Sequence, residues 1–316
     1  MRLLVVTNLY PTPEDMSFGT FVDEQVVALR ARGVEVDVLF INGRKNRLNY
    51  LWGPLRLWKM MMSKKYDLIH SHYVFAGVIG RCQTTVPLVH SFHGAGEMEG
   101  WQGWLCKRLS AVVNGATVTS KRHHADLGMK DARVVPCGAD MELFRPMPKD
   151  ECRSRLGLSM DEKLPLFAGA QRPEKRVPLI EEAVALVAKD DPAVRLLVAT
   201  AIPHDEIPVW MNAADCLVLA SDWEGSPVVI KEAMACDLPV VTVDVGDTAE
   251  VIEGVEGCWL AEQTAEDLAA NIRSALAFDG TCGGREAVSK LTLDHTIEGV
   301  LKLYQDVLDG KVGTSA

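Results

Sequence analysis

Several features that mark common classes of protein are missing from the sequence. The apolar run after Met1 is too short for a signal peptide, and no stretch of 18 apolar residues occurs, so no transmembrane helix is expected. The Walker, G-x-S-x-G and H-E-x-x-H motifs are absent, which argues against the enzyme classes that depend on them. The eight cysteines lie at least 15 residues apart and form no C-x-x-C pair. This spacing excludes the usual zinc sites and is typical of reduced thiols, so we expect a cytoplasmic protein.

The positive charge that nucleic-acid binding usually requires is also lacking. The formal net charge is −10, and the excess of acid lies in the second part of the chain. Residues 1–147 carry 18 Lys and Arg against 13 Asp and Glu, whereas the remainder carries 15 against 30. We therefore expect no nucleic-acid partner, although the basic first part could face an anionic surface or ligand.

The positions of the apolar runs predict an α/β fold with two doubly wound domains. Helical segments separate most of these runs, and this alternation favours parallel sheets with helices on both faces. The pattern starts again after the polar stretch 145–157, so we place domains at 1–147 and 148–292, and a final helix at 293–316. The expected strands are 2–9, 35–41, 67–72, 87–93, 116–120, 132–136, 164–170, 195–201, 216–221, 239–245 and 257–261, and the main expected helices are 20–32, 177–189, 207–214, 226–236, 264–278 and 294–309.

Two glutamates lie beside one of these helices. Ser226 as N-cap and a proline at the first helical position predict that the helix covers 226–236, with Glu224 just before it and Glu232 inside it. Such a helix presents free backbone N–H groups and positive dipole charge near Gly225 and Ser226, where an anion would be stabilised. Glutamates in helices are more often solvated surface charge, so the spacing alone leaves both interpretations open.

The longer segment EGSPVVIKEAMACDLPVV resembles a known signature. It is similar to the E-x7-E motif of retaining glycosyltransferases of the GT-B fold, in particular family 4. NLYP, GTFVDEQVVAL, DLIHSHYVFAG, VHSFHGAGE and PCGADMELFRP resemble further family segments in the same order, so the resemblance spans nearly the whole chain. It implies a GT-B fold, in which two Rossmann-like domains face each other across a cleft. It also implies a nucleotide-sugar donor, bound mainly by the second domain, and no metal or other cofactor.

The resemblance gives roles to individual residues. Glu224 would hydrogen-bond the hydroxyls of the donor sugar, and Glu232 would hydrogen-bond the ribose. Lys175 would offset negative charge on the leaving nucleoside diphosphate, and His93 would lie beside the transferred sugar. Glu224, His93 and Lys175 are therefore the candidate catalytic residues. The other donor-binding candidates would lie near the diphosphate: Gly19, whose missing side chain permits a close approach, Arg172, Gly225, Ser226, and the backbone N–H groups of Val228 and Val229.

The chain departs from the family pattern at three places. Ala170 occupies the position of the family's diphosphate-binding arginine, and Arg172 is the candidate replacement. The acidic residue that the family has shortly after His93 is Gly96 here, with Glu97 adjacent. The connection near Ile202 is shortened where the family lines its nucleobase pocket, so no base preference carries over.

Residues 44–66 form the most basic stretch, with seven Lys and Arg and no acidic residue. Trp52, Leu55, Trp58 and Met62 could share one face of a helix, which is the composition of an interfacial helix attracted to anionic lipid. The alternative is a domain helix whose apolar stripe lies in the core. Because family members with lipid-linked acceptors often dock in this way, a peripheral position at the inner membrane face stays open.

His70 and His72 alternate along an expected strand and would point to the same side. The sequence provides no acidic or cysteine partner at metal-ligand spacing, so a packed structural pair is favoured over a metal site.

The resemblance implies a retaining glycosyltransferase of the hexosyltransferase type. It would move a sugar from a UDP-, GDP- or ADP-sugar to a hydroxyl acceptor such as a lipid-linked or polysaccharide precursor glycan. A non-catalytic nucleotide-sugar binding protein would bind the donor without turnover, and a GT-B-fold nucleotide-sugar epimerase would convert the donor without an acceptor. A glycosidase would need the carboxyl groups of Glu224 and Glu232 about 5–9 Å apart.

Overall fold

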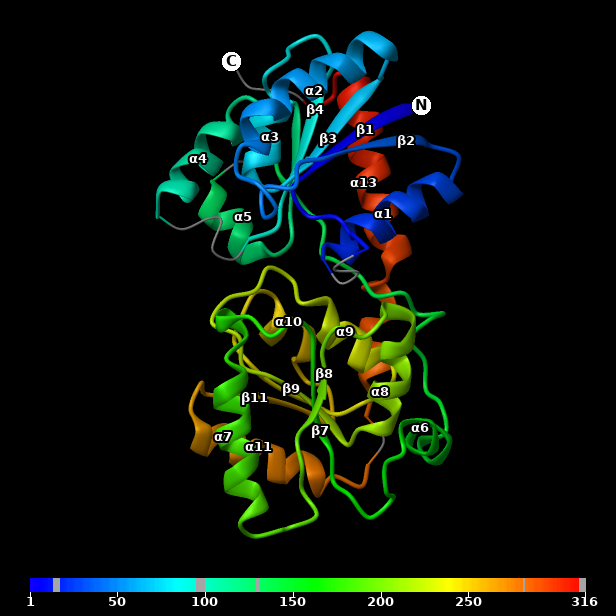
Figure 1. Cartoon of the computed structure of the whole chain (residues 1–316), viewed down its shortest axis with the longest axis vertical. Helices are drawn as coiled ribbons and strands as arrows, with labels where there is room; N and C mark the ends of the chain where they lie inside the picture. Colours follow the sequence, from blue (N-terminus) through cyan, green and yellow to red (C-terminus); the bar gives the residue numbers. More distant parts are fainter. Residues whose placement is uncertain (14–17, 95–99, 129–130, 281, 313–316) are drawn as a thin grey trace. The chain divides into compact units, whose positions relative to one another are not determined.

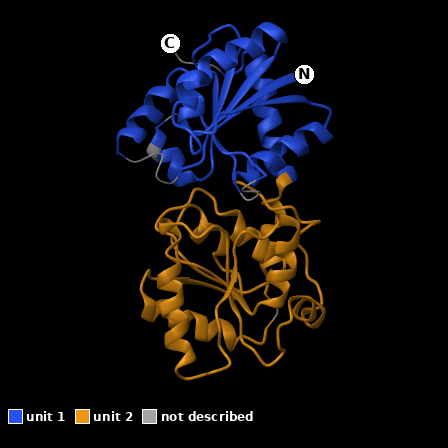
Figure 2. Ribbon diagram, viewed as in Figure 1, with its two compact units in different colours: residues 1–136, 294–316 blue, residues 137–293 orange. Residues whose placement is uncertain are grey.

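The chain forms two compact units, each with its own parallel sheet (Figure 2). Unit 1 comprises residues 1–136 and 294–316, and unit 2 comprises residues 137–293. Among the described residues, every helix is too short or too polar to span a bilayer. The computed structural model describes residues 1–13, 18–94, 100–128, 131–280 and 282–312.

Unit 1 is built on a six-stranded sheet in the order β2-β1-β3-β4-β5-β6 (Figure 1). Its strands are parallel, and β1, β3, β4 and β5 are buried almost throughout because helices cover such sheets on both faces. The strands are β1 (Arg2–Thr7), β2 (Glu35–Phe40), β3 (Leu68–His72), β4 (Leu88–Phe92), β5 (Gly115–Val118) and β6 (Arg133–Val134), and the helices are α1 (Thr20–Ala31), α2 (Asn49–Ser63), α3 (Val74–Gly80), α4 (Gly100–Ser110), α5 (Lys121–Leu127) and α13 (Leu293–Leu308).

Unit 2 repeats this plan with five parallel strands in the order β11-β10-β9-β7-β8. Its four-residue strands β7, β9 and β10 are fully buried and, apart from Thr242, apolar, as continuous apolar runs predict for a parallel sheet. The elements are α6 (Lys149–Leu156), β7 (Pro165–Ala168), η2 (Pro173–Lys175), α7 (Val177–Ala188), β8 (Leu197–Ala199), η3 (His204–Glu206), α8 (Ile207–Ala213), β9 (Cys216–Leu219), α9 (Val228–Ala235), β10 (Val240–Val243), α10 (Thr248–Ile252), β11 (Cys258–Ala261), α11 (Ala265–Leu276), α12 (Gly284–Ala287) and η4 (Val288–Lys290).

Each of the eleven expected strands is present, and the predicted α/β class with two Rossmann-like domains is confirmed. The segment 137–147, which the sequence boundary assigned to the first domain, groups with unit 2. Ala139 pairs with Thr292 as an isolated parallel bridge, and Arg285 donates a hydrogen bond of 2.8 Å to the carbonyl oxygen of Phe144. These contacts between distant parts of the chain attach the segment to unit 2.

The C-terminal helix α13 lies with unit 1. The hydroxyl of Tyr304 is 2.6 Å from Nδ1 of His70 in β3, and Arg133 forms an ion pair with Asp306. Gly115 in β5 has no side chain where Val307 of α13 approaches, since a Cβ there would lie 2.8 Å from the valine. The helix therefore completes the core of unit 1.

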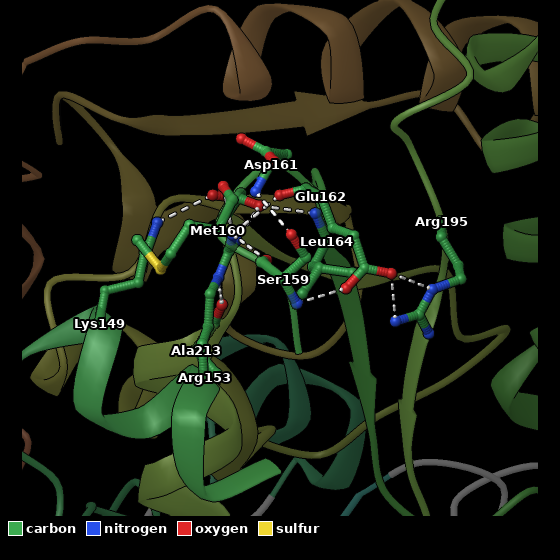
Figure 3. A network of polar contacts seen from close by, with 10 residues as sticks. Lys149, Arg153, Ser159, Met160, Asp161, Glu162, Leu164, Arg195 and Ala213 are labelled. Carbon is green, nitrogen blue, oxygen red and sulfur yellow. Dashed lines mark hydrogen bonds and ion pairs between the residues drawn. The ribbon is translucent and has the colours of Figure 1, made fainter. Parts of the chain in front are cut away.

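A buried guanidinium stabilises the start of unit 2 (Figure 3). Arg153 of α6 has a side chain only 2% exposed, yet each of its side-chain nitrogens donates a hydrogen bond. The acceptors belong to residues 159–215, which follow α6 in the chain and precede β9. Nη2 donates to Asp215 Oδ2 at 2.9 Å and Nε donates to the carbonyl oxygen of Ala213 at 2.9 Å. Nη1 donates to the carbonyl oxygens of Ser159, Met160 and Glu162.

Candidate functional site

The first candidate glutamate lies in the connection between β9 and α9. Glu224 Oε1 accepts hydrogen bonds from Lys175 Nζ at 2.5 Å and from Ser221 Oγ at 2.8 Å. Both charged side chains are mostly buried, which strengthens the ion pair relative to a surface pair. The backbone N–H of Asp222 also donates to the carbonyl oxygen of Glu174 at 2.8 Å, so the two loops are joined by main chain as well. The structure thus brings together Lys175 and Glu224, which the sequence predicted separately.

The helix after this glutamate begins two residues later than predicted. Pro227 is the N-cap of α9 and makes no side-chain capping bond. Ser226 is not the cap, because its hydroxyl donates to Asp247 Oδ2 at 2.6 Å and accepts from Lys231 Nζ. The predicted capping role of Ser226 is therefore wrong, since a buried ion pair engages the hydroxyl instead. Val228 and Val229 occupy the first turn of α9, where backbone N–H groups lack acceptors within the helix.

This ion pair joins Lys231 and Asp247, which the sequence interpretation overlooked. Lys231 has a side chain with no exposed surface, and its ammonium donates to Asp247 Oδ2 at 2.8 Å and to the carbonyl oxygen of Cys137 at 3.0 Å. Asp247 Oδ1 is buried and accepts no hydrogen bond from the part of the chain that the structure describes. The sequence signal was a lysine beside Glu232 in the mostly apolar run VVIKEAMA, because a helix with so many apolar residues is buried on most of its sides.

The turn that carries Asp247 lies directly against the Glu224 segment. Gly246 has a φ of +60°, and a Cβ on it would lie 2.5 Å from the carbonyl oxygen of Gly225. Only glycine combines this conformation with so close a backbone approach. The β10–α10 turn therefore packs directly against the backbone of Gly225.

The second candidate glutamate has a histidine partner. Glu232 in α9 has a side chain only 8% exposed, and its Oε1 lies 2.8 Å from Nε2 of His204. The imidazole packs on Phe144, with the ring centroids 5.2 Å apart. No sequence pattern predicted His204, because it follows the shortened connection near Ile202.

The loop before Lys175 carries Arg172, the candidate replacement for the family's arginine. Arg172 places Nη1 3.9 Å from Glu174 Oε1, and its side chain is more than a third exposed. Its backbone N–H donates to the carbonyl oxygen of Ala170 at 3.0 Å. Arg172 thus lies in the same short loop as Lys175, and its role toward a phosphate stays a prediction.

In unit 1, His93 follows β4 and lies among aromatic rings. Its Nε2 is 3.0 Å from Nδ1 of His72, and its ring centroid lies 4.9 Å from that of Phe21 and 4.8 Å from that of Tyr73. Burial lowers the pKa of His93 to about 3, helped by the nearby His123. His93 is therefore neutral at physiological pH. Gly96 and Glu97, named above beside it, lie outside the described residues.

Gly19 is the N-cap of α1 and has a φ of +78°. A Cβ there would lie 2.6 Å from the carbonyl carbon of Leu9, so the turn itself requires glycine. Its predicted approach to a phosphate stays a prediction.

His70 is engaged on both sides of its ring. Nδ1 lies 2.6 Å from the Tyr304 hydroxyl and Nε2 lies 2.7 Å from Ser91 Oγ, as a structural histidine requires. Among the described residues, no group of three or more His, Cys, Asp or Glu side chains could hold a metal ion.

The helix α2, within the basic stretch 44–66, exposes its apolar stripe. Trp52, Trp58 and Met62 have 58%, 57% and 75% of their surface exposed, whereas Leu57 on the opposite side is fully buried. The alternative, in which this stripe lies in the core, is wrong because α2 packs on unit 1 through its other face. The stripe itself covers no part of the core.

Two further exposed tryptophans lie on α4. Trp101 and Trp104 are 64% and 60% exposed, and the guanidinium of Arg108 lies over the Trp104 ring, 5.2 Å from its centroid. Phe75 of α3 contacts both helices, because its ring lies 5.2 Å from Tyr50 of α2 and 5.8 Å from Trp101. We call Trp52, Trp58, Trp101 and Trp104, together with Arg108 and the Lys and Arg residues of 44–66, the tryptophan surface.

The fold and the site together define a class of protein. Two Rossmann-like units with parallel sheets, of which the second carries the E-x7-E segment at the start of α9, identify the GT-B fold. Sucrose-phosphate synthase from Thermosynechococcus elongatus superposes with a TM-score of 0.84 at 20% identity, covering 98% of this chain and 99% of that one. Anabaena HepE in complex with UDP superposes with a TM-score of 0.73 at 17% identity, covering 97% and 100%.

Two family models match parts of the chain. The model described as Glycosyltransferase Family 4 matches residues 16–143, and the model described as Glycosyl transferases group 1 matches residues 200–277. The predicted resemblance to family 4 glycosyltransferases is confirmed.

Individual relatives agree with this assignment. A D-inositol 3-phosphate glycosyltransferase of Geodermatophilus obscurus is 27% identical over 76% of this chain, which spans 66% of that protein's length. TuaC of Bacillus subtilis, a glycosyltransferase assigned to teichuronic acid biosynthesis, is 27% identical over 85% of this chain and 87% of its own length.

Proposed function

We propose that this protein is a retaining glycosyltransferase that moves a sugar from a nucleotide-sugar donor to a hydroxyl acceptor. The observation that supports it most directly is the contact between Lys175 and Glu224 beside the first turn of α9. A cation and a carboxylate thus meet just before the first turn of α9, where backbone N–H groups have no acceptor within the helix. Each is the type of group that one part of a nucleotide sugar requires.

The chemistry of the donor matches this arrangement. Lys175 can stabilise the negative charge that develops on the leaving diphosphate, together with the N–H groups of Val228 and Val229. Glu224 can accept hydrogen bonds from sugar hydroxyls, and Ser221 fixes its orientation. Arg172 would add a second cation to the diphosphate, and no step of this scheme uses a metal.

The remaining candidates keep their proposed roles. Glu232 would accept a hydrogen bond from the ribose, and Gly19 would permit a close approach of its loop to the phosphates. His93 would contact the transferred sugar as a neutral hydrogen-bonding group, because burial lowers its pKa to about 3.

Donor binding is tested first, by thermal shift with UDP, GDP, ADP and their sugars. We expect one base series to raise the melting temperature, and Lys175→Met to abolish most of that rise. Lys189→Met, an exposed lysine of the same unit, is the matched control and should respond like the wild type. If no nucleotide stabilises the wild-type protein, the proposal is wrong.

Transfer is tested with the donor so identified and a panel of lipid-linked and free glycan acceptors. We expect Glu224→Gln to lower kcat by about 100-fold or more, because the transition state loses charge-dependent stabilisation. Product of retained anomeric configuration, and full activity in EDTA, are the expected results. Donor binding without transfer would favour a non-catalytic binding protein, and conversion of the donor without acceptor would favour an epimerase.

We also propose that the tryptophan surface of unit 1 docks on anionic membrane, where lipid-linked acceptors would be available. Tryptophans are favoured at bilayer interfaces, and the seven Lys and Arg of 44–66 would be attracted to anionic headgroups. The protein would then be cytoplasmic and peripheral at the inner membrane face.

Vesicle sedimentation tests this docking. Vesicles with anionic lipid should bind the protein, purely zwitterionic vesicles should bind it weakly, and salt should reduce binding. Trp52→Ser combined with Trp58→Ser should lower vesicle binding, whereas Trp223→Ser, an exposed tryptophan of unit 2, should not. Equal loss in both variants would contradict the assignment to this surface.

A further inference from the structure

A histidine outside the motifs that carry the family resemblance contacts the second glutamate of the site. His204 Nε2 is 2.8 Å from Glu232 Oε1, and the histidine side chain is 27% exposed whereas the glutamate is 8% exposed. The imidazole is thus the outer member of the pair and the carboxylate the inner one. We propose that His204 is a positioning residue that orients Glu232 toward the ribose of the nucleotide donor.

The backbone around His204 places this residue at the end of a short connection. The histidine opens the 3-10 helix η3 directly after Pro203, and the N–H of Glu206 donates to the carbonyl oxygen of Pro203 at 3.0 Å. Ala201, two residues before the proline, has a φ of +55°, so the connection turns sharply after β8. This short connection brings His204 to α9.

The ring also rests on a rigid support. Phe144 is fully buried, and its carbonyl oxygen accepts from Arg285 Nη1 at 2.8 Å. The centroids of Phe144 and His204 lie 5.2 Å apart at an interplanar angle of 53°. The buried phenyl ring therefore limits the positions open to the imidazole, and the imidazole in turn contacts the carboxylate of Glu232.

The consequence for binding is preorganisation. A glutamate side chain loses rotamer freedom when a ligand immobilises it, and a glutamate already held by His204 loses less. The expected gain in affinity is about three- to tenfold. The inference rests on the proposed function, because it assigns His204 an effect on a ribose contact of that donor site.

The experiment compares dissociation constants of wild type, His204→Ala and His204→Gln by calorimetry. The ligand is whichever of UDP, GDP and ADP binds the wild type most tightly, together with its 2′-deoxy and 3′-deoxy analogues. His204→Ala should bind the ribonucleotide about three- to tenfold more weakly. His204→Gln should recover most of the loss, because the carboxamide can still donate to Glu232. His295→Ala, an exposed histidine of unit 1, is the matched control.

The deoxy analogues separate positioning from other effects. Against the analogue that lacks the hydroxyl bound by Glu232, wild type and His204→Ala should bind almost equally. An unchanged constant for the ribonucleotide in His204→Ala would overturn the inference, and so would an equal loss for all three ligands. In both cases the proposed function stands, because the wild type still binds nucleotide. Failure of the wild type to bind any of the three nucleotides would overturn the proposed function and the inference together.

Discussion

Replacing the buried Lys231 with methionine is the sharpest test of how this site is supported. The ammonium donates to Asp247, to Ser226 and to the carbonyl oxygen of Cys137, and its side chain has no exposed surface. Methionine fills a similar volume but provides no donor. The variant therefore leaves Asp247 as a buried carboxylate whose remaining partner is the Ser226 hydroxyl.

The expected loss of stability is large. Breaking a buried ion pair by removing one partner typically costs about 3–5 kcal/mol, because the other charge stays buried without compensation. Asp247 Oδ1 already accepts no hydrogen bond within the described residues, so few other contacts would stabilise the charged carboxylate after the lysine is removed. We expect Lys231→Met to lower the unfolding free energy of unit 2 by an amount in this range. The double variant Lys231→Met, Asp247→Ala should lose clearly less, because no uncompensated charge is left.

Denaturant unfolding measured separately for the two units provides the assay. Lys163→Met, which breaks an exposed pair with Asp191 in the same unit, is the matched control and should change stability little. A loss below about 1 kcal/mol in Lys231→Met would refute the reasoning. So would a double variant that is as unstable as the sum of its two single changes.

Two further perturbations have clear expected outcomes. Burial lowers the pKa of His70 to about 3, from an ordinary value near 6.5, so between these values the unfolded chain binds a proton that the folded chain does not. The unfolding free energy of unit 1 should therefore fall as the pH is lowered through this window, by up to about 1.4 kcal/mol per pH unit from this group, and His70→Asn should flatten the slope measured by denaturant unfolding. Gly246→Ala should weaken both stability and nucleotide affinity because its methyl group would displace Gly225, whereas Gly254→Ala, also at positive φ but with no atom within 4 Å of its Cβ, should affect stability alone; equal affinity in both variants would contradict this account.

The strands and helices were predictable because they depend on local pattern. Continuous apolar runs can be buried on both faces only in a parallel sheet with helical cover, so β1, β7 and β10 follow from their own residues. Glu224 and Lys175 were predictable as site candidates because the family resemblance marks each within a short motif. Their contact at 2.5 Å was not readable from either motif alone, since 49 residues separate them.

The errors and omissions share a different cause. Ser226 had the right residue type and place for an N-cap, yet the hydroxyl bonds instead to Asp247, 21 residues away. Lys231 has no local feature that distinguishes it from other helical lysines, because its acceptors Asp247 and Cys137 lie far from it in the sequence. A local sequence pattern indicates only the hydrogen-bond partners that a side chain can reach within one helical turn. A charged partner that is distant in sequence can form the stronger interaction.

The sequence by itself determined the class of fold, the order of the strands along the chain and the E-x7-E segment that carries the resemblance to family 4. Only the tertiary structure decided which loops meet at the ends of those strands, because the order in the sheet, β11-β10-β9-β7-β8, differs from the order in the chain. That order brings the β10–α10 turn against Gly225 and the shortened β8 connection against Glu232. Backbone hydrogen bonds and apolar burial fix the elements locally, whereas the polar contacts of the site depend on the arrangement of all of them.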